Sequence, residues 1–205
     1  MDKNKEGAYD FDESLVEGQR REAEFFNKHA KSIKSRTDGR QGDAIVNDGL
    51  DSKLELKSES YTITDTPKTR TCKGGTPNFF IERYSRGKID GGPWQALSHG
   101  CKYYVHDFAD DVCFVFDDIS ALIARLEEII PLFNLKPEEI NNPKYYTYGY
   151  KINRELLRDL FREVHGNEDL LLGGKTYPIS GRIKEQEVYN EVMQKYTSNR
   201  LCGKT

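Results

Sequence analysis

The chain has 205 residues, a net charge of −3, and 11% aromatic residues, which fits one folded domain and excludes a disordered chain. No apolar run reaches the roughly 18 residues that span a bilayer, and the N-terminus lacks the apolar core of a signal peptide. We therefore expect a cytoplasmic protein without a membrane partner. The four cysteines are scattered without a CxxC pair, which predicts reduced thiols.

The first periodic segment, residues 14–34, predicts an amphipathic helix. Leu15, Phe25 and Phe26 lie on its apolar face, and Glu22 is the only carboxylate within that face. Burying a carboxylate is costly unless it is paired or bound to a cation. Glu22 is therefore a candidate functional residue, and a buried pair with Arg or Lys is the alternative.

The pattern of residues 43–58 predicts a β-hairpin with an Asn-Asp-Gly turn. In its second strand, residues 53–58, charged residues alternate with leucine. If the apolar residues of both strands share the core face, then Asp43, Glu55 and Lys57 lie together on the opposite face. A solvated strand face is the alternative interpretation.

The remaining elements follow in chain order after a long polar loop at residues 59–78. Turn residues, capping residues and hydrophobic periodicity separate these elements. We expect strands at 78–84, 103–108, 112–116 and 145–152, and helices at 94–98, 119–130, 153–164 and 184–196. This order predicts an α/β protein in which helices flank a sheet.

A helix carboxylate, a strand aspartate and a Glu-x-Lys strand form a set suited to phosphodiester hydrolysis. Mg²⁺ prefers an octahedral shell of oxygens from one or two carboxylates, water and phosphate. We expect Asp43, Glu55 and the carbonyl of Leu56 to hold Mg²⁺, for which Mn²⁺ can substitute. Glu22 is expected to hold a second metal or its water. Lys57 would position the attacking water and stabilise the developing charge.

At these residues the sequence resembles the PD-(D/E)XK nuclease superfamily, over roughly residues 14–116. Gly18 to Glu22, GQRRE, is similar to the GxxxE of resolvase-type members. Asp43 matches the aspartate of the motif, and Glu55 to Lys57 matches its (D/E)XK tripeptide. Residues 78–108 are similar to a segment of small phage-type nucleases, in which a strand ending in Ile-Glu precedes a Gly-rich turn and an aromatic strand.

The resemblance implies a restriction-endonuclease-like fold, with a central mixed β-sheet flanked by helices. The nuclease-like core would span residues 14–130, after a tail at 1–13 and before a mainly helical C-terminal extension at 131–205 that packs on the core. Gly42 stands where the motif has proline.

The implied function is that of a Mg²⁺-dependent deoxyribonuclease, an endonuclease rather than an exonuclease. It would act on DNA in the cytoplasm, with a phage-encoded origin and a homodimer as candidates. A catalytically inactive protein of the same fold, acting as an inhibitor or assembly factor, is the alternative, and another metal-dependent hydrolase is a third.

Two basic segments, residues 28–40 and 66–88, are expected to contact backbone phosphates. A mixed charged surface is the alternative. The candidate nucleic-acid-binding residues are Lys34, Arg36, Arg40, Lys68, Arg70, Lys73, Arg83 and Arg86. Glu82 and Gln95 are candidate peripheral residues of the metal site, with a sheet-face ion pair and a surface position as their respective alternatives.

Overall fold

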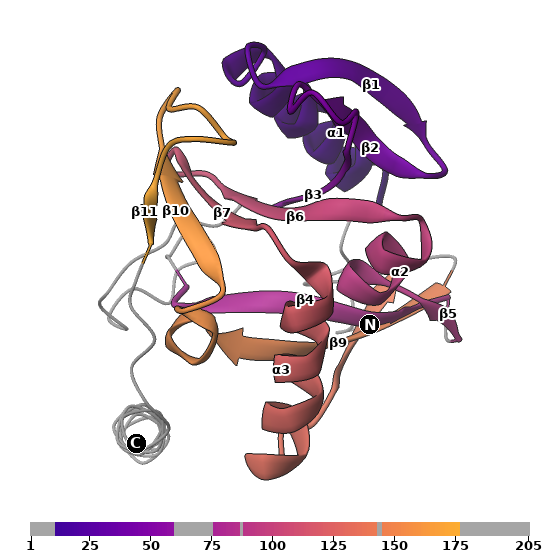
Figure 1. The fold of residues 1–205 in the computed structure, drawn as a ribbon. Helices are drawn as coiled ribbons and strands as arrows, with labels where there is room; N and C mark the ends of the chain where they lie inside the picture. Colours follow the sequence, from indigo (N-terminus) through magenta and orange to yellow (C-terminus); the bar gives the residue numbers. More distant parts are fainter. Residues whose placement is uncertain (1–10, 60–75, 87, 143–144, 177–205) are drawn as a thin grey trace, which may run out of the picture.

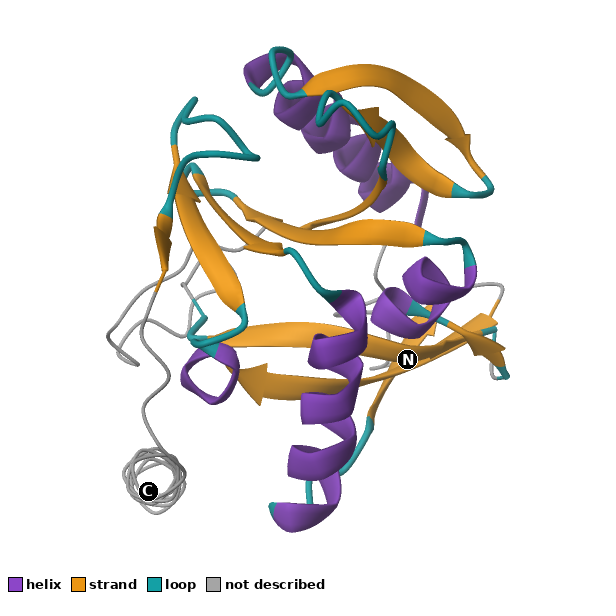
Figure 2. Cartoon of the chain, in the orientation of Figure 1, coloured by secondary structure: helices purple, strands orange, loops and turns teal. Residues whose placement is uncertain are grey.

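The computed structural model describes residues 11–59, 76–86, 88–142 and 145–176 (Figure 1). Within these residues it contains two β-sheets and helices that pack on them, as Figure 2 shows. The α/β class predicted from the sequence is therefore confirmed. None of the described helices combines the length and the apolar character needed to cross a membrane.

The elements have the following bounds. The helices are α1 (Phe11–Lys28), α2 (Gly92–Ser98), α3 (Ile119–Leu132) and the 3-10 helix η1 (Arg154–Leu157). The strands are β1 (Ile33–Gly39), β2 (Gly42–Val46), β3 (Lys53–Ser58), β4 (Asn78–Ser85), β5 (Ile89–Asp90), β6 (Cys101–Phe108), β7 (Val112–Phe116), β8 (Glu138–Asn142), β9 (Tyr145–Asn153), β10 (Phe161–His165) and β11 (Lys175–Thr176).

Sheet A has seven strands in the order β1-β2-β3-β6-β7-β10-β11, and sheet B has four in the order β5-β4-β9-β8. The pair β3–β6 is parallel, while the other neighbouring strands of sheet A are antiparallel. This parallel pair joins the N-terminal hairpin to the rest of the sheet. Its register sets Glu55 beside Tyr104 and Lys57 beside His106.

Sheet A separates two hydrophobic clusters. Helix α1 lies on one side of its central strands, and α3 with sheet B lies on the other (Figure 1). On one face, Phe25 and Phe26 of α1 pack against Leu54 and Leu56 of β3. On the other face, side chains of β6 and β7 pack against sheet B, α2 and α3, with Phe79 of β4 fully buried in this cluster. Because both faces of the sheet are covered, a charged residue of β3 lies next to packed side chains rather than in open solvent.

The predicted helix at 14–34 differs from the structure at its C-terminal end. Helix α1 ends at Lys28, the Ser32 N–H donates to the His29 carbonyl at 2.9 Å, and β1 begins at Ile33. Strand β1 pairs with β2, in a register that sets Arg36 beside Ala44. The polar sequence of β1 gives no strand signal, so this pairing overrides the helical pattern.

The predicted helix at 153–164 is wrong. This segment forms η1 and then β10, which pairs with β7 in sheet A. The strand predicted at 145–152 is present as β9, which pairs with β4 in sheet B. The described part of the C-terminal segment is therefore built into both sheets, and the prediction of a mainly helical extension is wrong for it. The predicted helix at 184–196 lies outside the described residues.

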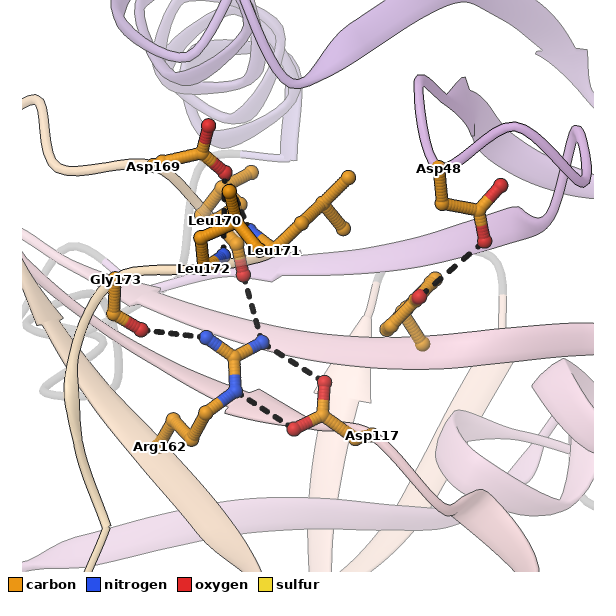
Figure 3. A network of polar contacts seen from close by, with 9 residues as sticks. Asp48, Asp117, Arg162, Asp169, Leu170, Leu171, Leu172 and Gly173 are labelled. Carbon is orange, nitrogen blue, oxygen red and sulfur yellow. Dashed lines mark hydrogen bonds and ion pairs between the residues drawn. The ribbon is translucent and has the colours of Figure 1, made fainter.

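An arginine clamp holds the loop that follows β10 (Figure 3). Arg162 donates two hydrogen bonds to the Asp117 carboxylate, at 2.7 and 2.8 Å, and further bonds to the carbonyls of Leu170 and Gly173. Asp169 accepts from the Leu171 N–H in the same loop. This network fixes the loop against the end of β7.

The packing of α3 provides a matched test of the core. Leu126 is fully buried, whereas Leu132 on the same helix is 62% exposed. We expect Leu126→Ala to lower the free energy of unfolding by about 2–5 kcal/mol, because it leaves a cavity. Leu132→Ala should change it by less than about 0.5 kcal/mol. Urea unfolding measures both, and equal effects would contradict this placement of α3.

Candidate functional site

The hairpin β2–β3 brings Asp43 and Glu55 to one face of sheet A. Ala44 pairs with Leu54, and both are buried against α1, so the alternate residues face away from α1. Asp43 Oδ2 accepts a hydrogen bond from the Leu56 N–H at 2.7 Å. The register predicted from the sequence is confirmed, although no observation tests the predicted roles of these residues.

Glu22 approaches this hairpin from α1. Its side chain is 38% exposed, and its carboxylate lies 4.0 Å from the guanidinium of Arg36. Partial burial and the neighbouring Asp43 raise the pKa of Glu22, while Arg36 and Lys57 oppose the shift. The alternative of a buried ion pair with Arg or Lys does not hold, because the contact with Arg36 is long and half-exposed. Glu22 stays within electrostatic reach of Asp43.

Glu55 is the most perturbed carboxylate of the site. Its Oε2 atom is buried and has no hydrogen-bond partner among the described residues. Burial raises the pKa of Glu55 to about 8, and the charges of Asp43, Glu82 and Glu22 add to the shift. The charges of three carboxylates therefore act on Glu55, and we call Glu22, Asp43, Glu55 and Glu82 the carboxylate cluster.

Glu82 joins the cluster through two glycines that precede and begin α2. A Cβ on Gly91 would lie 2.9 Å from Glu82 Oε1, and one on Gly92 would lie 2.5 Å from the Glu82 carbonyl. Only residues without a Cβ let α2 approach β4 this closely. The sequence predicted Glu82 as a peripheral residue of the metal site, and that role stays a prediction. Gln95 is half-buried in α2.

Cys101 is a neighbour that the sequence did not indicate. A Cβ on Gly42 would lie 2.7 Å from its sulfur, and Gly42 has a φ of +93°. Proline, with φ fixed near −65°, cannot adopt this conformation, which explains why the residue before Asp43 is glycine. Burial, Glu55 and Asp43 raise the pKa of the Cys101 thiol to about 12, so the thiol is neutral.

The predicted nucleic-acid-binding residues differ from one another in their exposure and in the residues that they contact. Lys34 pairs with Asp51 at 2.6 Å, and Arg40 lies 3.5 Å from Asp38 with its side chain 86% exposed. Arg36 lies over the Phe26 ring at 4.8 Å.

The other candidates lie in or near the second basic segment. Arg83 is an ion-pair partner of Asp90 and stacks over Tyr84 and Trp94. Arg86 is exposed in the turn after β4. Lys68, Arg70 and Lys73 lie outside the described residues.

The arrangement can bind a cation or take up a proton. Mutual repulsion in the carboxylate cluster favours either event, because both reduce the negative charge. Within the described ranges, no group of three or more His, Cys, Asp or Glu side chains is placed to hold a metal ion, so the protein would supply at most two such ligands. A bound cation would therefore keep water or phosphate ligands, as Mg²⁺ commonly does.

No family model and no solved structure matches this chain. A curated relative, the tRNA (guanine-N(1)-)-methyltransferase of Ureaplasma parvum serovar 3, is 28% identical over 159 residues. The match covers 70% of this chain and 66% of the relative, so the chain spans just under two thirds of the relative's length.

This comparison contradicts the prediction of a PD-(D/E)XK nuclease. The relative is named as a methyltransferase for tRNA, not as a Mg²⁺-dependent deoxyribonuclease. The predicted DNA endonuclease activity and phage-like character are therefore wrong, and the inactive nuclease-fold alternative gains no support. The physical reason is that strand alternation alone brings Asp43, Glu55 and Lys57 together. The motif thus indicates a side-chain placement but no particular reaction.

The raised pKa of Glu55 makes stability depend on pH. Because this pKa is about 8 in the folded state against an ordinary 4.5, the folded protein binds the extra proton. The stability from this group is complete below the ordinary value and is lost as the pH rises through about 8. In chelator, we expect the free energy of unfolding to fall more steeply across this window in the wild type than in Glu55→Gln.

Urea unfolding across the pH range measures this difference. The control is Glu24→Gln, which removes a carboxylate that is 59% exposed on α1, and its profile should match that of the wild type. Parallel profiles for the wild type and Glu55→Gln would show that Glu55 ionises normally.

Proposed function

We propose that this chain binds nucleic acid, with RNA as the favoured partner, through a divalent cation held at the carboxylate cluster. The observation that carries the proposal is the unpartnered, buried Oε2 of Glu55 among three other carboxylates. A buried carboxylate oxygen without a donor is costly, and a cation removes that cost.

The donors of the site suit Mg²⁺ or Mn²⁺. Asp43 and Glu55 would provide carboxylate oxygens, and the Leu56 carbonyl would add a backbone oxygen. Glu22 and Glu82 would contact the ion through its water molecules. Hard oxygen donors of this kind select Mg²⁺ and Mn²⁺ over softer ions. When bound, the ion would neutralise a phosphate of the nucleic acid and fix its position.

RNA is favoured as the partner because the curated relative is named for a tRNA. The DNA partner predicted from the sequence remains a prediction, as do the homodimer and the cytoplasmic location. Arg36 and the exposed Arg40 lie on β1 and in the turn after it, next to the hairpin that carries Asp43. These side chains would contact phosphates beside the cation.

The proposal is tested by nucleic-acid binding at constant ionic strength. We expect Mg²⁺ to tighten wild-type binding to an unmodified tRNA transcript by about tenfold relative to chelator. This gain in affinity corresponds to one added charge-assisted contact. Asp43→Asn should abolish this gain, because asparagine can accept the Leu56 N–H bond but lacks the charge. Fluorescence anisotropy measures the affinities.

Glu24→Gln is the matched control and should retain the full Mg²⁺ response. A DNA duplex of equal length, tested in parallel, distinguishes the two partners. Binding that is equally strong in Mg²⁺ and chelator, for the transcript and the duplex alike, would contradict the proposal.

A second candidate function is methylation of a base in RNA, which only the name of the relative favours. Glu55 has a pKa of about 8 and is the described residue best suited to accept a proton from a base nitrogen.

This candidate is tested with radiolabelled S-adenosylmethionine and the same transcript. If the chain methylates RNA, label should enter the wild-type reaction, and Glu55→Gln should lower the rate by about 10²-fold or more, as for loss of a general base. Absence of label in the wild-type reaction would remove this candidate without affecting the cation test.

A further inference from the structure

The end of β4 carries a stack of side chains that the cation site does not use. Strand β4 contacts α2 and pairs with the short strand β5 (Figure 1). The guanidinium carbon of Arg83 lies over two aromatic rings, 4.2 Å from the centre of Tyr84 and 4.5 Å from that of Trp94. We call Trp94, Arg83 and Tyr84 the aromatic stack.

An irregularity in β4 brings Arg83 and Tyr84 together. Neighbouring residues of a regular strand point to opposite faces of the sheet. The register of β4 with β9 shifts between Glu82 and Tyr84, a shift of the kind that a β-bulge produces, and a bulge redirects side chains. Arg83 also forms an ion pair with Asp90 of β5. The guanidinium is therefore held in place from two sides, by the rings and by a carboxylate.

The two rings of the aromatic stack have different surroundings. Trp94 is partly buried and packs against the hydrophobic cluster that contains Phe79. Tyr84 is 37% exposed, although Arg83 covers one face of its ring. The surface of the Tyr84 ring that a ligand can reach is therefore its opposite face and its edge. The stack is anchored in the core at Trp94 and presents Tyr84 to solvent.

The aromatic stack adjoins the carboxylate cluster. The Gly91 N–H donates to the Arg83 carbonyl at 3.0 Å, and a Cβ on Gly91 would lie 2.6 Å from Glu82 Cγ. The residue before α2 thus contacts both the stack and the cluster. Arg86 and Lys88 are exposed in the turn between β4 and β5. Their positive charges, close to Tyr84 in the chain, would attract the phosphates that flank a bound base.

We propose that Tyr84 is a stacking platform for an unpaired base of RNA. This inference rests on the proposed binding of nucleic acid. Every base has an aromatic face, so stacking on Tyr84 would tolerate any sequence. Arg83 and Trp94 hold the ring in place before the base arrives, which lowers the entropy lost on binding. Only bases outside a duplex can offer a free face, so the platform would select single-stranded parts of an RNA.

The test is the affinity for a short single-stranded oligoadenylate in Mg²⁺, measured by fluorescence anisotropy. Tyr84→Leu removes the ring but keeps an apolar side chain, and we expect it to weaken binding by about five- to 100-fold, as for loss of one stacked base. Tyr84→Phe keeps the ring and should bind within about twofold of the wild type. The matched control is Tyr146→Leu, on a tyrosine of β9 that is 49% exposed and lies outside the aromatic stack.

The same sugar-phosphate chain without bases separates stacking from phosphate contacts. The wild type and Tyr84→Leu should bind this abasic chain equally weakly, because it leaves Tyr84 nothing to stack on. The inference is overturned if Tyr84→Leu binds oligoadenylate as the wild type does, if Tyr84→Phe loses as much affinity as Tyr84→Leu, or if the wild type does not bind oligoadenylate. Absence of a Mg²⁺ response with the tRNA transcript would instead overturn the proposed cation site, and the effect of Tyr84→Leu would stand.

Discussion

The parallel pairing of β3 with β6 is the constraint on which the site depends. It fixes which side chains of β3 face α1 and which face the layer formed by sheet B, α2 and α3. Leu54 and Leu56 fill the cluster beneath α1, so Glu55 and Lys57 must face the opposite layer. The charges of β3 are consequently set beside Tyr104 and His106, where water cannot screen them fully.

The electrostatics follow from that placement. Burial is the largest cause of the raised pKa of Glu22, Asp43 and Glu55, and repulsion between carboxylates is the next cause for Glu22 and Glu55. For Asp43, the Leu56 N–H partly offsets the burial. Such an arrangement costs folding free energy in the absence of a positive partner. Proteins keep costly charge clusters chiefly at sites that bind something.

The hairpin was predictable because its determinants are local. An Asn-Asp-Gly turn and a two-residue period predict the register, which places Asp43 and Glu55 on one face as expected. Long-range features were not predictable. Cys101 of β6 lies against Gly42 of β2, and no local pattern links these two strands. The missed strand β1 has a polar sequence and exists because β2 offers a free edge.

The strands of the C-terminal segment were missed for a related reason. Residues 153–164 have a helical pattern, yet pairing with β7 makes their second half a strand. The nuclease assignment is wrong for a different reason. A three-residue motif indicates where side chains lie, whereas a reaction depends on the whole site. The positions of Asp43 and Glu55 do not depend on the nuclease assignment. The cation proposal rests on those positions.

Paramagnetic broadening by Mn²⁺ in a nuclear magnetic resonance titration tests the central claim most directly. If the carboxylate cluster holds the ion, substoichiometric Mn²⁺ should first broaden the backbone amides of Asp43, Glu55 and Glu82, because the effect falls steeply with distance. Signals of α3, which packs on the other core, should remain sharp. Uniform broadening, or broadening centred away from β2 and β3, would contradict the account.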